Sequence, residues 1–419
     1  MQRRPTAIEI TLVFTAFIAV TYGFGIYLFA SLVPEMRRDL GFDYGTVGLV
    51  TGIAQAGFLI ASLLSGIAAP LIGEMRLILG AVVATSLSLL LMTHAGSTAM
   101  LGLLLTVMGA AAAAVWVPMV SICQQLIPAR HQGKALGLMS SGTSYGVFIN
   151  GVIVPPLVAG SGWRSVWLSV GIGALLLLLV TAWRLRHLRA RSPADQAAAD
   201  LPPAMVMPLG HRLRLVLRPV GLLMIATMFL NGLACMPFQT YLVPLMREDF
   251  GWTVENATRV WSLIGATGMV GGFALGWLAD RITIKWAMLL TYLLLAGGAL
   301  IAFAMPRFVT PNILLMNGAG ILFGLAFYAI FGLVPAYISA VFRGDAATLL
   351  FGIGNIALGL GGLLGNLIGG YAKTLSGSFS PIYGIVTLAA FGLVLLALLT
   401  PRERRQVKLS GQVAVTTSS

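Results

Sequence analysis

The chain has 419 residues, of which 58% are apolar and only 9% are charged, whereas soluble globular domains are about 45–50% apolar and about 25% charged. This composition excludes a soluble protein and, with it, a nucleic-acid-binding protein. A membrane-spanning helix needs roughly 20 mostly apolar residues, so the apolar content suffices for about twelve spans. In a membrane protein, the net charge of +13 indicates which loops face the cytoplasm, because cytoplasmic loops carry an excess of Lys and Arg.

Apolar runs separated by charged residues and by Pro or Gly predict the spans in chain order. The first six are expected near residues 9–34, 46–70, 76–94, 97–122, 133–158 and 164–183. Six more are expected near residues 218–245, 256–279, 286–305, 310–340, 347–372 and 380–400. The sequence therefore predicts an all-α integral membrane protein with a six-helix bundle over 1–183, a basic linker over 184–217, a second six-helix bundle over 218–400 and a tail over 401–419.

The 26 Lys and Arg residues divide unevenly between the two sides of this predicted topology. With the N-terminus in the cytoplasm, 19 of them fall on the cytoplasmic side and 7 on the other. Cytoplasmic loops carry the excess of basic residues, so both termini and the linker are expected in the cytoplasm. The short loops are typical of a bacterial protein, and we expect a multi-pass protein of the bacterial inner membrane.

An internal repeat relates the two bundles. The chain reads LVPEMRRDLGF over residues 32–42 and LVPLMREDFGW over residues 242–252, with seven identities in eleven positions. A repeat at a constant offset indicates duplicated structural units. The two six-helix halves are therefore expected to lie in parallel orientation, an arrangement in which transporters bind their substrate near the midplane between the halves.

The loop after the eighth predicted span carries a family motif. Its sequence GWLADRITIK, residues 276–285, resembles the G-x-L-a-D-R-x-x-x-K signature of the major facilitator superfamily, to which the chain is similar over essentially its whole length. The resemblance implies alternating access between two six-helix bundles, with Asp280 and Arg281 latching the cytoplasmic side shut; the alternative for this pair is a plain stop-transfer cluster of charges. In the first half, Pro70 stands at the Asp position, which argues against a symmetric second latch.

Three further segments resemble one group of transporters within this superfamily. GFGIYLFASLVPEMRRDLG, GKALGLMSSGTSYG and GWRSVW are similar to bacterial relatives of the monocarboxylate and oxalate/formate porters. This similarity implies secondary-active transport of a small monocarboxylate or related organic acid. Those porters bring a basic residue into the membrane core, but no Lys or Arg stands in the middle of a predicted span here. Arg259, near the outer end of the eighth span, is the only candidate here for the role of that basic residue.

Ionisable groups are confined to the ends of the predicted spans and to loops, where all thirteen acidic residues and all four histidines fall. Because an ionisable group inside a membrane usually marks a relay or an active site, this distribution argues against an intramembrane enzyme. Without an ionisable group at the midplane, three modes of transport remain: facilitated diffusion, exchange, or transport with a proton carried by the substrate itself. The last two are favoured. Glu35 and Asp39 are expected to be solvated loop residues, with a proton step in the outer vestibule as the alternative.

An uncharged cavity must be built from neutral groups, and the first span of each three-helix unit is expected to line it. The candidate substrate-binding residues are aromatic and amide side chains of spans 1, 4, 7 and 10, two amides of spans 5 and 11, and the arginine of span 8: Tyr22, Tyr27, Trp116, Asn150, Asn231, Gln239, Arg259, Tyr328 and Asn355. For each amide the alternative is a hydrogen bond between helices, and for each aromatic residue it is packing or an interface position.

The remaining expectations concern partners. Two cysteines, Cys123 and Cys235, provide neither a disulfide framework nor a metal cluster, and the P-loop motif for phosphate binding is absent from the sequence, so no metal or cofactor is expected. A monomer with a complete pathway is expected in the bilayer, moving a small organic solute with or without a proton. Because a charge-free aromatic cavity also suits an apolar ligand, efflux of lipophilic compounds is the second possibility.

Glycines gather in spans 5 and 11 and predict close, sliding helix contacts.

Overall fold

The computed structural model describes residues 6–127, 129–185, 209–308, 310–342 and 345–403, which form helices joined by short loops and contain no strand. Twelve segments of the described chain are long and apolar enough to cross a membrane, which confirms the predicted fold class. They are Ala7–Leu40, Tyr44–Ala69, Glu74–His94, Thr98–Cys123, Lys134–Ser161, Trp163–Ala182, Pro219–Asp249, Val254–Arg281, Ile284–Pro306, Ile313–Val341, Ala346–Ser376 and Ser380–Leu399.

The described residues form eighteen helical elements, all of which contribute to these segments except one short helix, Leu209–Val216. The N-terminal half contains α1 (Ala7–Ile18), the π-helix η1 (Ala19–Phe24), α2 (Leu28–Leu40), α3 (Tyr44–Ile72), α4 (Glu74–Leu91), η2 (Met92–His94), α5 (Thr98–Leu126), α6 (Ala129–Ser140), α7 (Gly142–Ser161) and α8 (Trp163–Leu185). The C-terminal half contains α10 (Leu209–Val216), α11 (Pro219–Pro244), the π-helix η3 (Leu245–Asp249), α12 (Val254–Arg281), α13 (Ile284–Phe308), α14 (Ile313–Val341), α15 (Asp345–Ser376) and α16 (Ser380–Leu399). Most of the predicted linker and of the tail lies outside the described residues, and α10 forms the end of the linker.

The first span continues past the proline at which its end was predicted. Pro34 lies inside α2, which runs on to Leu40. Glu35 is therefore part of a helix, and only 10% of its side chain is exposed, so its predicted place in a solvated loop is wrong. The two copies of the repeat end alike, because Gly41 and Gly251 both have positive φ angles, 71° and 68°, which glycine adopts without steric cost.

Polar caps begin several of the membrane helices. Thr6 and Glu9 form a capping box at the start of α1, and Asp43 accepts a hydrogen bond from the backbone N–H of Thr46 at the start of α3. The Thr46 backbone and hydroxyl groups hold the pKa of Asp43 below its usual value. Such caps satisfy N–H groups that would otherwise lack partners at a helix end, which permits short connections between spans.

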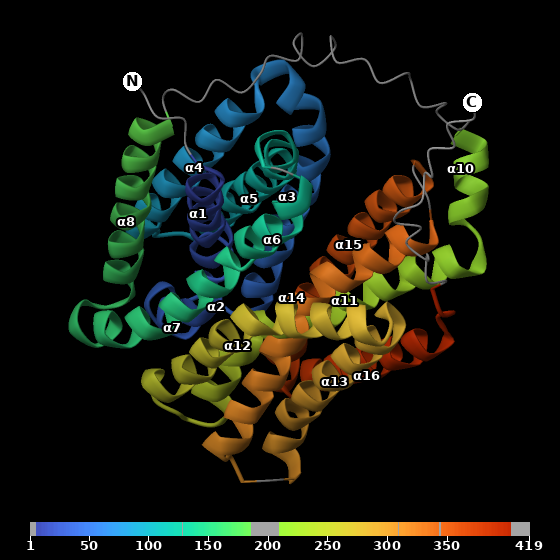
Figure 1. Cartoon of the computed structure of the whole chain (residues 1–419). Helices are drawn as coiled ribbons and strands as arrows, with labels where there is room; N and C mark the ends of the chain where they lie inside the picture. The colour runs from blue at the N-terminus through green and yellow to red at the C-terminus, as the bar shows by residue number, and fades with distance from the viewer. Residues whose placement is uncertain (1–5, 128, 186–208, 309, 343–344, 404–419) are drawn as a thin grey trace, which may run out of the picture.

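The two halves meet at one end of the molecule and diverge toward the other, at which α8 ends and α10 begins (Figure 1). We name the closed end, formed around residues 35–43 and 247–253, the distal end. Two helix pairs form most of the seam between the halves, with α3 against α15 and α7 against α12, and α2 also contacts α11. The glycine-rich spans 5 and 11 thus each face a helix of the opposite half, but not one another.

Glycines allow the seam to close. A Cβ atom on Gly48 of α3 would lie 2.5 Å from the Asn366 carbonyl oxygen of α15, and one on Gly151 of α7 would lie 2.0 Å from the Ser262 hydroxyl of α12. Other glycines of α15 serve packing within their own half, such as Gly361, whose Cβ would lie 2.1 Å from the Phe229 carbonyl oxygen. Small residues let membrane helices approach at backbone distance, so both seams depend on glycine.

Candidate functional site

The first span is interrupted near its middle. The π-helix η1 ends at Phe24, and Gly25–Tyr27 form a turn before α2 begins. Gly23 packs so closely against Gly146 of α7 that a Cβ atom on Gly23 would lie 2.4 Å from the Gly146 Cα atom. Asn150 of α7 donates a hydrogen bond of 2.8 Å to the Gly23 carbonyl, satisfying a backbone group at the break. Such π-helical turns frequently mark functional sites.

A small cavity of about 60 Å³ lies between the halves directly at this break. Its wall combines amide, hydroxyl and aromatic side chains from α3, α11, α15 and the first span. The side chains that give the wall its chemistry are Tyr27, Phe29, Thr51, Gln55, Phe58, Gln239, Thr240 and Asn366. Among the described residues that line the cavity, none carries a charge, as expected from the sequence.

Gln239 is the most distinctive polar group of this wall. Its side chain is 1% exposed, and neither atom of its amide makes a hydrogen bond of good geometry with a described residue, although the amide lies against the Tyr27 hydroxyl. The Asn366 side-chain oxygen is likewise buried without a partner. A buried polar group left unpaired costs roughly 1–3 kcal/mol. The two amides are therefore poised for a polar solute.

Two of the predicted substrate-binding residues, Tyr27 and Gln239, line the cavity. Tyr22 stands one layer behind, edge-on to the lining residue Phe58 with ring centroids 6.1 Å apart. Trp116 in turn packs edge-on against Tyr22 at 6.3 Å. Tyr22 and Trp116 thus support the aromatic wall through packing.

The three predicted asparagines bond to the protein. The Asn150 bond joins two spans of the N-terminal half, the Asn231 amide donates to the Tyr292 hydroxyl at 3.2 Å, and the Asn355 amide donates to the Phe351 carbonyl of its own helix at 3.0 Å. None of the three is among the described residues lining the cavity. A hydrogen bond between helices, the alternative left open for these amides, describes the contacts of Asn150 and Asn231 in this conformation, whereas the Asn355 bond stays within its own helix.

The last two candidates lie elsewhere. Tyr328 packs edge-on against Phe327 with ring centroids 4.9 Å apart, and its buried hydroxyl lies against Ser144 without a hydrogen bond of good geometry to a described residue. Arg259 is exposed near the distal end of α12. Neither residue lines the cavity in this conformation.

The Asn231 contact predicts a stability effect without a binding effect. Replacing Tyr292 with Phe should lower the melting temperature of the purified protein by a few degrees, because it leaves the buried Asn231 amide unpaired at a cost of roughly 1–3 kcal/mol. Solute affinity should stay unchanged, and thermal unfolding together with a binding titration checks both. Weakened binding at an unchanged melting temperature would instead put Asn231 in the binding site.

Comparison with known proteins identifies the family. The family model of the Major Facilitator Superfamily matches residues 15–349. The chain belongs to the major facilitator superfamily. A gallate transporter of Pseudomonas putida is 25% identical, over 91% of this chain and 89% of that protein. A 4-hydroxybenzoate transporter of Pseudomonas aeruginosa is 24% identical, over 86% of this chain and 85% of that protein, and a purine ribonucleoside efflux pump of Shigella sonnei is 24% identical over 91% of each.

A solved structure shares the fold. The bacterial homologue of the human lysosomal transporter Spinster, in an inward-facing and unoccupied conformation, superimposes with a TM-score of 0.67 at 17% identity, covering 95% of this chain and 96% of that one. Membership of the superfamily makes the chain a multi-pass membrane transporter of small organic solutes and not an enzyme.

The superfamily motif lies at the end of α12, where the chain turns into α13. Asp280 and Arg281 are both exposed, and the Arg281 guanidinium stacks over the Trp277 ring at 4.8 Å. Asp280 forms no ion pair with another residue of the described chain. The latch role of this pair stays a prediction.

Sequence reasoning missed lining residues on α3 and α15. Thr51 and Gln55 of α3, with Asn366 of α15, line the cavity, but these helices are not the first spans of their three-helix units, from which most of the predicted residues come. The signal that could have found them is an amide inside an apolar run, since Gln55 and Asn366 stand within otherwise apolar segments.

Proposed function

We propose that this transporter carries a small aromatic hydroxy acid across the bacterial inner membrane by alternating access, with both termini in the cytoplasm. The observation that carries the proposal is the uncharged cavity at the break of the first span, where aromatic rings surround the unpaired Gln239 amide. The names of two relatives, transporters of gallate and of 4-hydroxybenzoate, support the same solute class.

The cavity wall matches this class group by group. The rings of Tyr27 and Phe58 offer edges and faces to a benzene ring, and aromatic pairs are stabilised in such arrangements. The amides of Gln239 and Asn366 both donate and accept hydrogen bonds, as a carboxyl group and phenol hydroxyls require. A ligand site that is mostly apolar, with a few convergent polar groups, is the usual form of a small-molecule site.

The absence of charged residues from the described cavity wall bears on how transport is coupled to protons. A carboxylate that enters an uncharged cavity loses hydration that no cation replaces, and burying an unpaired charge is costly. The same cavity accepts the protonated acid without this penalty. This favours movement of the solute together with a proton that it carries itself, which agrees with the lack of acidic residues among the described lining. Arg259, being exposed, stands outside the proposed site.

Export of a neutral compound is the second candidate. The uncharged wall suits a neutral solute equally well, and one relative is a purine ribonucleoside efflux pump. The sequence of this chain is about as similar to that pump as to the 4-hydroxybenzoate transporter, so substrate screening must decide.

The deciding experiment is a thermal-shift screen of the purified protein in detergent. A ligand that binds the folded state raises its apparent stability. We expect gallate, 4-hydroxybenzoate or a close analogue to raise the melting temperature, with a larger shift at lower pH where more of the acid is protonated, and Arg259→Gln to leave the shift unchanged. Stabilisation only by inosine or by lipophilic compounds would replace the organic-acid proposal with export.

A further inference from the structure

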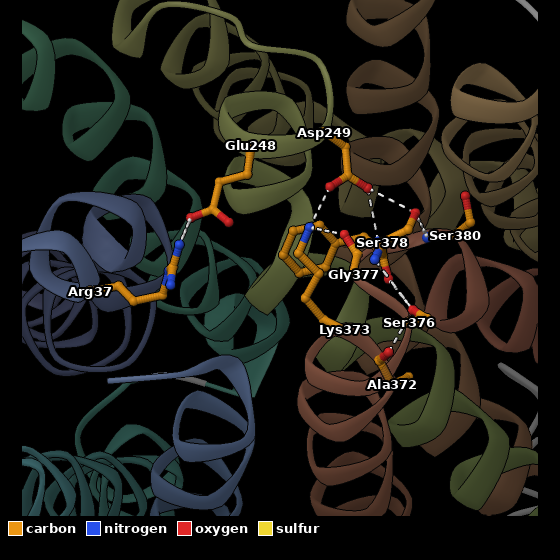
Figure 2. A network of polar contacts seen from close by, with 10 residues as sticks. Arg37, Glu248, Asp249, Ala372, Lys373, Ser376, Gly377, Ser378 and Ser380 are labelled. Carbon is orange, nitrogen blue, oxygen red and sulfur yellow. Dashed lines mark hydrogen bonds and ion pairs between the residues drawn. The ribbon is translucent and has the colours of Figure 1, made fainter. Parts of the chain in front are cut away.

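The distal end is closed by two ion pairs that cross between the halves. The Arg37 guanidinium of α2 donates to Glu248 of η3 at 3.1 Å, as Figure 2 shows. In the opposite direction, the Arg247 guanidinium of η3 donates to Glu35 of α2 at 2.9 Å. Arg37 and Arg247 are identical positions of the internal repeat, 210 residues apart. The duplicated motif thus places one arginine of each half against a glutamate of the other.

The aspartates of the same motif stay within their own halves. Asp249 accepts hydrogen bonds from the Lys373 ammonium at 2.6 Å, the Ser378 hydroxyl at 3.1 Å and the Phe379 backbone N–H at 2.8 Å (Figure 2). Its repeat equivalent, Asp39, pairs with Arg164 and accepts from the Trp163 indole at 3.1 Å. Each copy of the motif is therefore anchored to its own half by its aspartate, while its arginine reaches across.

The two crossing pairs differ in burial. Glu35 and Arg247 have side chains 10% and 14% exposed, whereas Arg37 and Glu248 are 34% and 17% exposed. Screening by water and salt weakens an exposed pair more than a buried one, so Glu35 and Arg247 make the stronger closure. The second Glu35 oxygen and the Arg247 Nε atom are both buried without a partner, so this pair lacks the second bond that a two-point arginine–carboxylate pair would have.

We propose that Arg37, Glu248, Arg247 and Glu35 form the distal gate of the transport cycle. The two pairs hold the distal side closed while the solute exchanges at the other side, and both break when the distal side opens and water solvates the four charges. The incomplete Glu35–Arg247 pair keeps closure reversible, because a single hydrogen bond between the charges has to be broken. The inference rests on alternating access in the proposed function, but it does not depend on which solute is carried.

The test measures the opening of the distal seam directly. Both native cysteines are replaced by alanine, and spin labels are attached through Ser161→Cys at the end of α7 and Asn256→Cys at the start of α12, two exposed positions on opposite halves. Pulsed electron spin resonance in lipid nanodiscs, without solute, then gives the distribution of distances between the labels. Glu35→Gln should raise the distal-open population by roughly tenfold, because it leaves the Arg247 charge buried and unpaired. Glu248→Gln, in the more exposed pair, should have a smaller effect.

A double-mutant cycle and a matched control complete the test. The double variant with Glu35→Gln and Arg247→Gln should open no more than the stronger single variant, since coupled residues give non-additive effects. Arg164→Gln removes an arginine at the same end whose partner, Asp39, belongs to the same half, and it should leave the distances unchanged. Wild-type distances in Glu35→Gln and Glu248→Gln, or an equal shift in Arg164→Gln, would overturn the gate. Because no solute is present, these outcomes are independent of the substrate screen.

Discussion

Replacing Gln239 with Leu is expected to weaken solute binding and transport by roughly 10- to 100-fold, because a polar group of the bound solute would be left buried without its partner, at a cost of roughly 1–3 kcal/mol. The stability of the protein should not fall. In the absence of solute the Gln239 amide is buried and unpaired, so an apolar side chain of similar volume removes an unsatisfied group. The predicted signature is lower affinity with an equal or higher melting temperature.

Asn231→Leu is the matched comparison, since Asn231 is an amide on the same helix, α11, that bonds to Tyr292 and not to the cavity. Its signature should be the reverse, with a lower melting temperature and unchanged affinity. Titration by calorimetry and thermal unfolding, run on both variants, separate the two roles. If Gln239→Leu lowered the melting temperature while binding stayed at the wild-type level, Gln239 would be a packing residue.

Gly48→Val should reduce transport by roughly tenfold or more, on the scale of the 1–3 kcal/mol that overpacking costs. A Cβ atom at this position would lie 2.5 Å from the Asn366 carbonyl oxygen and 3.2 Å from the Leu367 Cα atom. Both are backbone atoms of α15 and cannot move aside as a side chain can. The valine must push α3 away from α15, so the distal side should no longer close.

Gly66→Val is the control for this prediction. Gly66 lies on the same helix, but a Cβ atom there would meet nothing within 4 Å, so transport should remain near the wild-type level. Uptake assays on cells with matched expression levels compare the two variants. Equal activity of Gly48→Val and the wild-type protein would show that the α3–α15 contact is not needed for the cycle.

The spans could be predicted from the sequence because the signal is local. Apolar runs with charged ends reflect transfer of each segment from water to lipid, which depends little on the other helices. Pro34 misled the prediction of one helix end, since the first turn after it remained helical. The cause is that membrane helices tolerate proline where neighbouring groups satisfy the freed backbone atoms.

The site was predictable only in part, because it depends on how the halves meet. The sequence indicates Tyr27 and Gln239 from their place in spans 1 and 7, and both line the cavity. The sequence cannot tell the unpaired Gln239 amide from the Asn231 amide that bonds to Tyr292, because both are amide side chains in the same apolar span. Likewise the repeat reveals that Arg37 and Arg247 are equivalent, but their glutamate partners are found only across the seam.

The most direct test of the account is uptake of radiolabelled 4-hydroxybenzoate by liposomes that contain the purified protein. The account predicts saturable uptake above that of empty liposomes, competition by unlabelled gallate, acceleration by an inward proton gradient and loss of uptake in the Gln239→Leu variant. Uptake of a purine ribonucleoside but of neither aromatic acid, in the same liposomes, would contradict it.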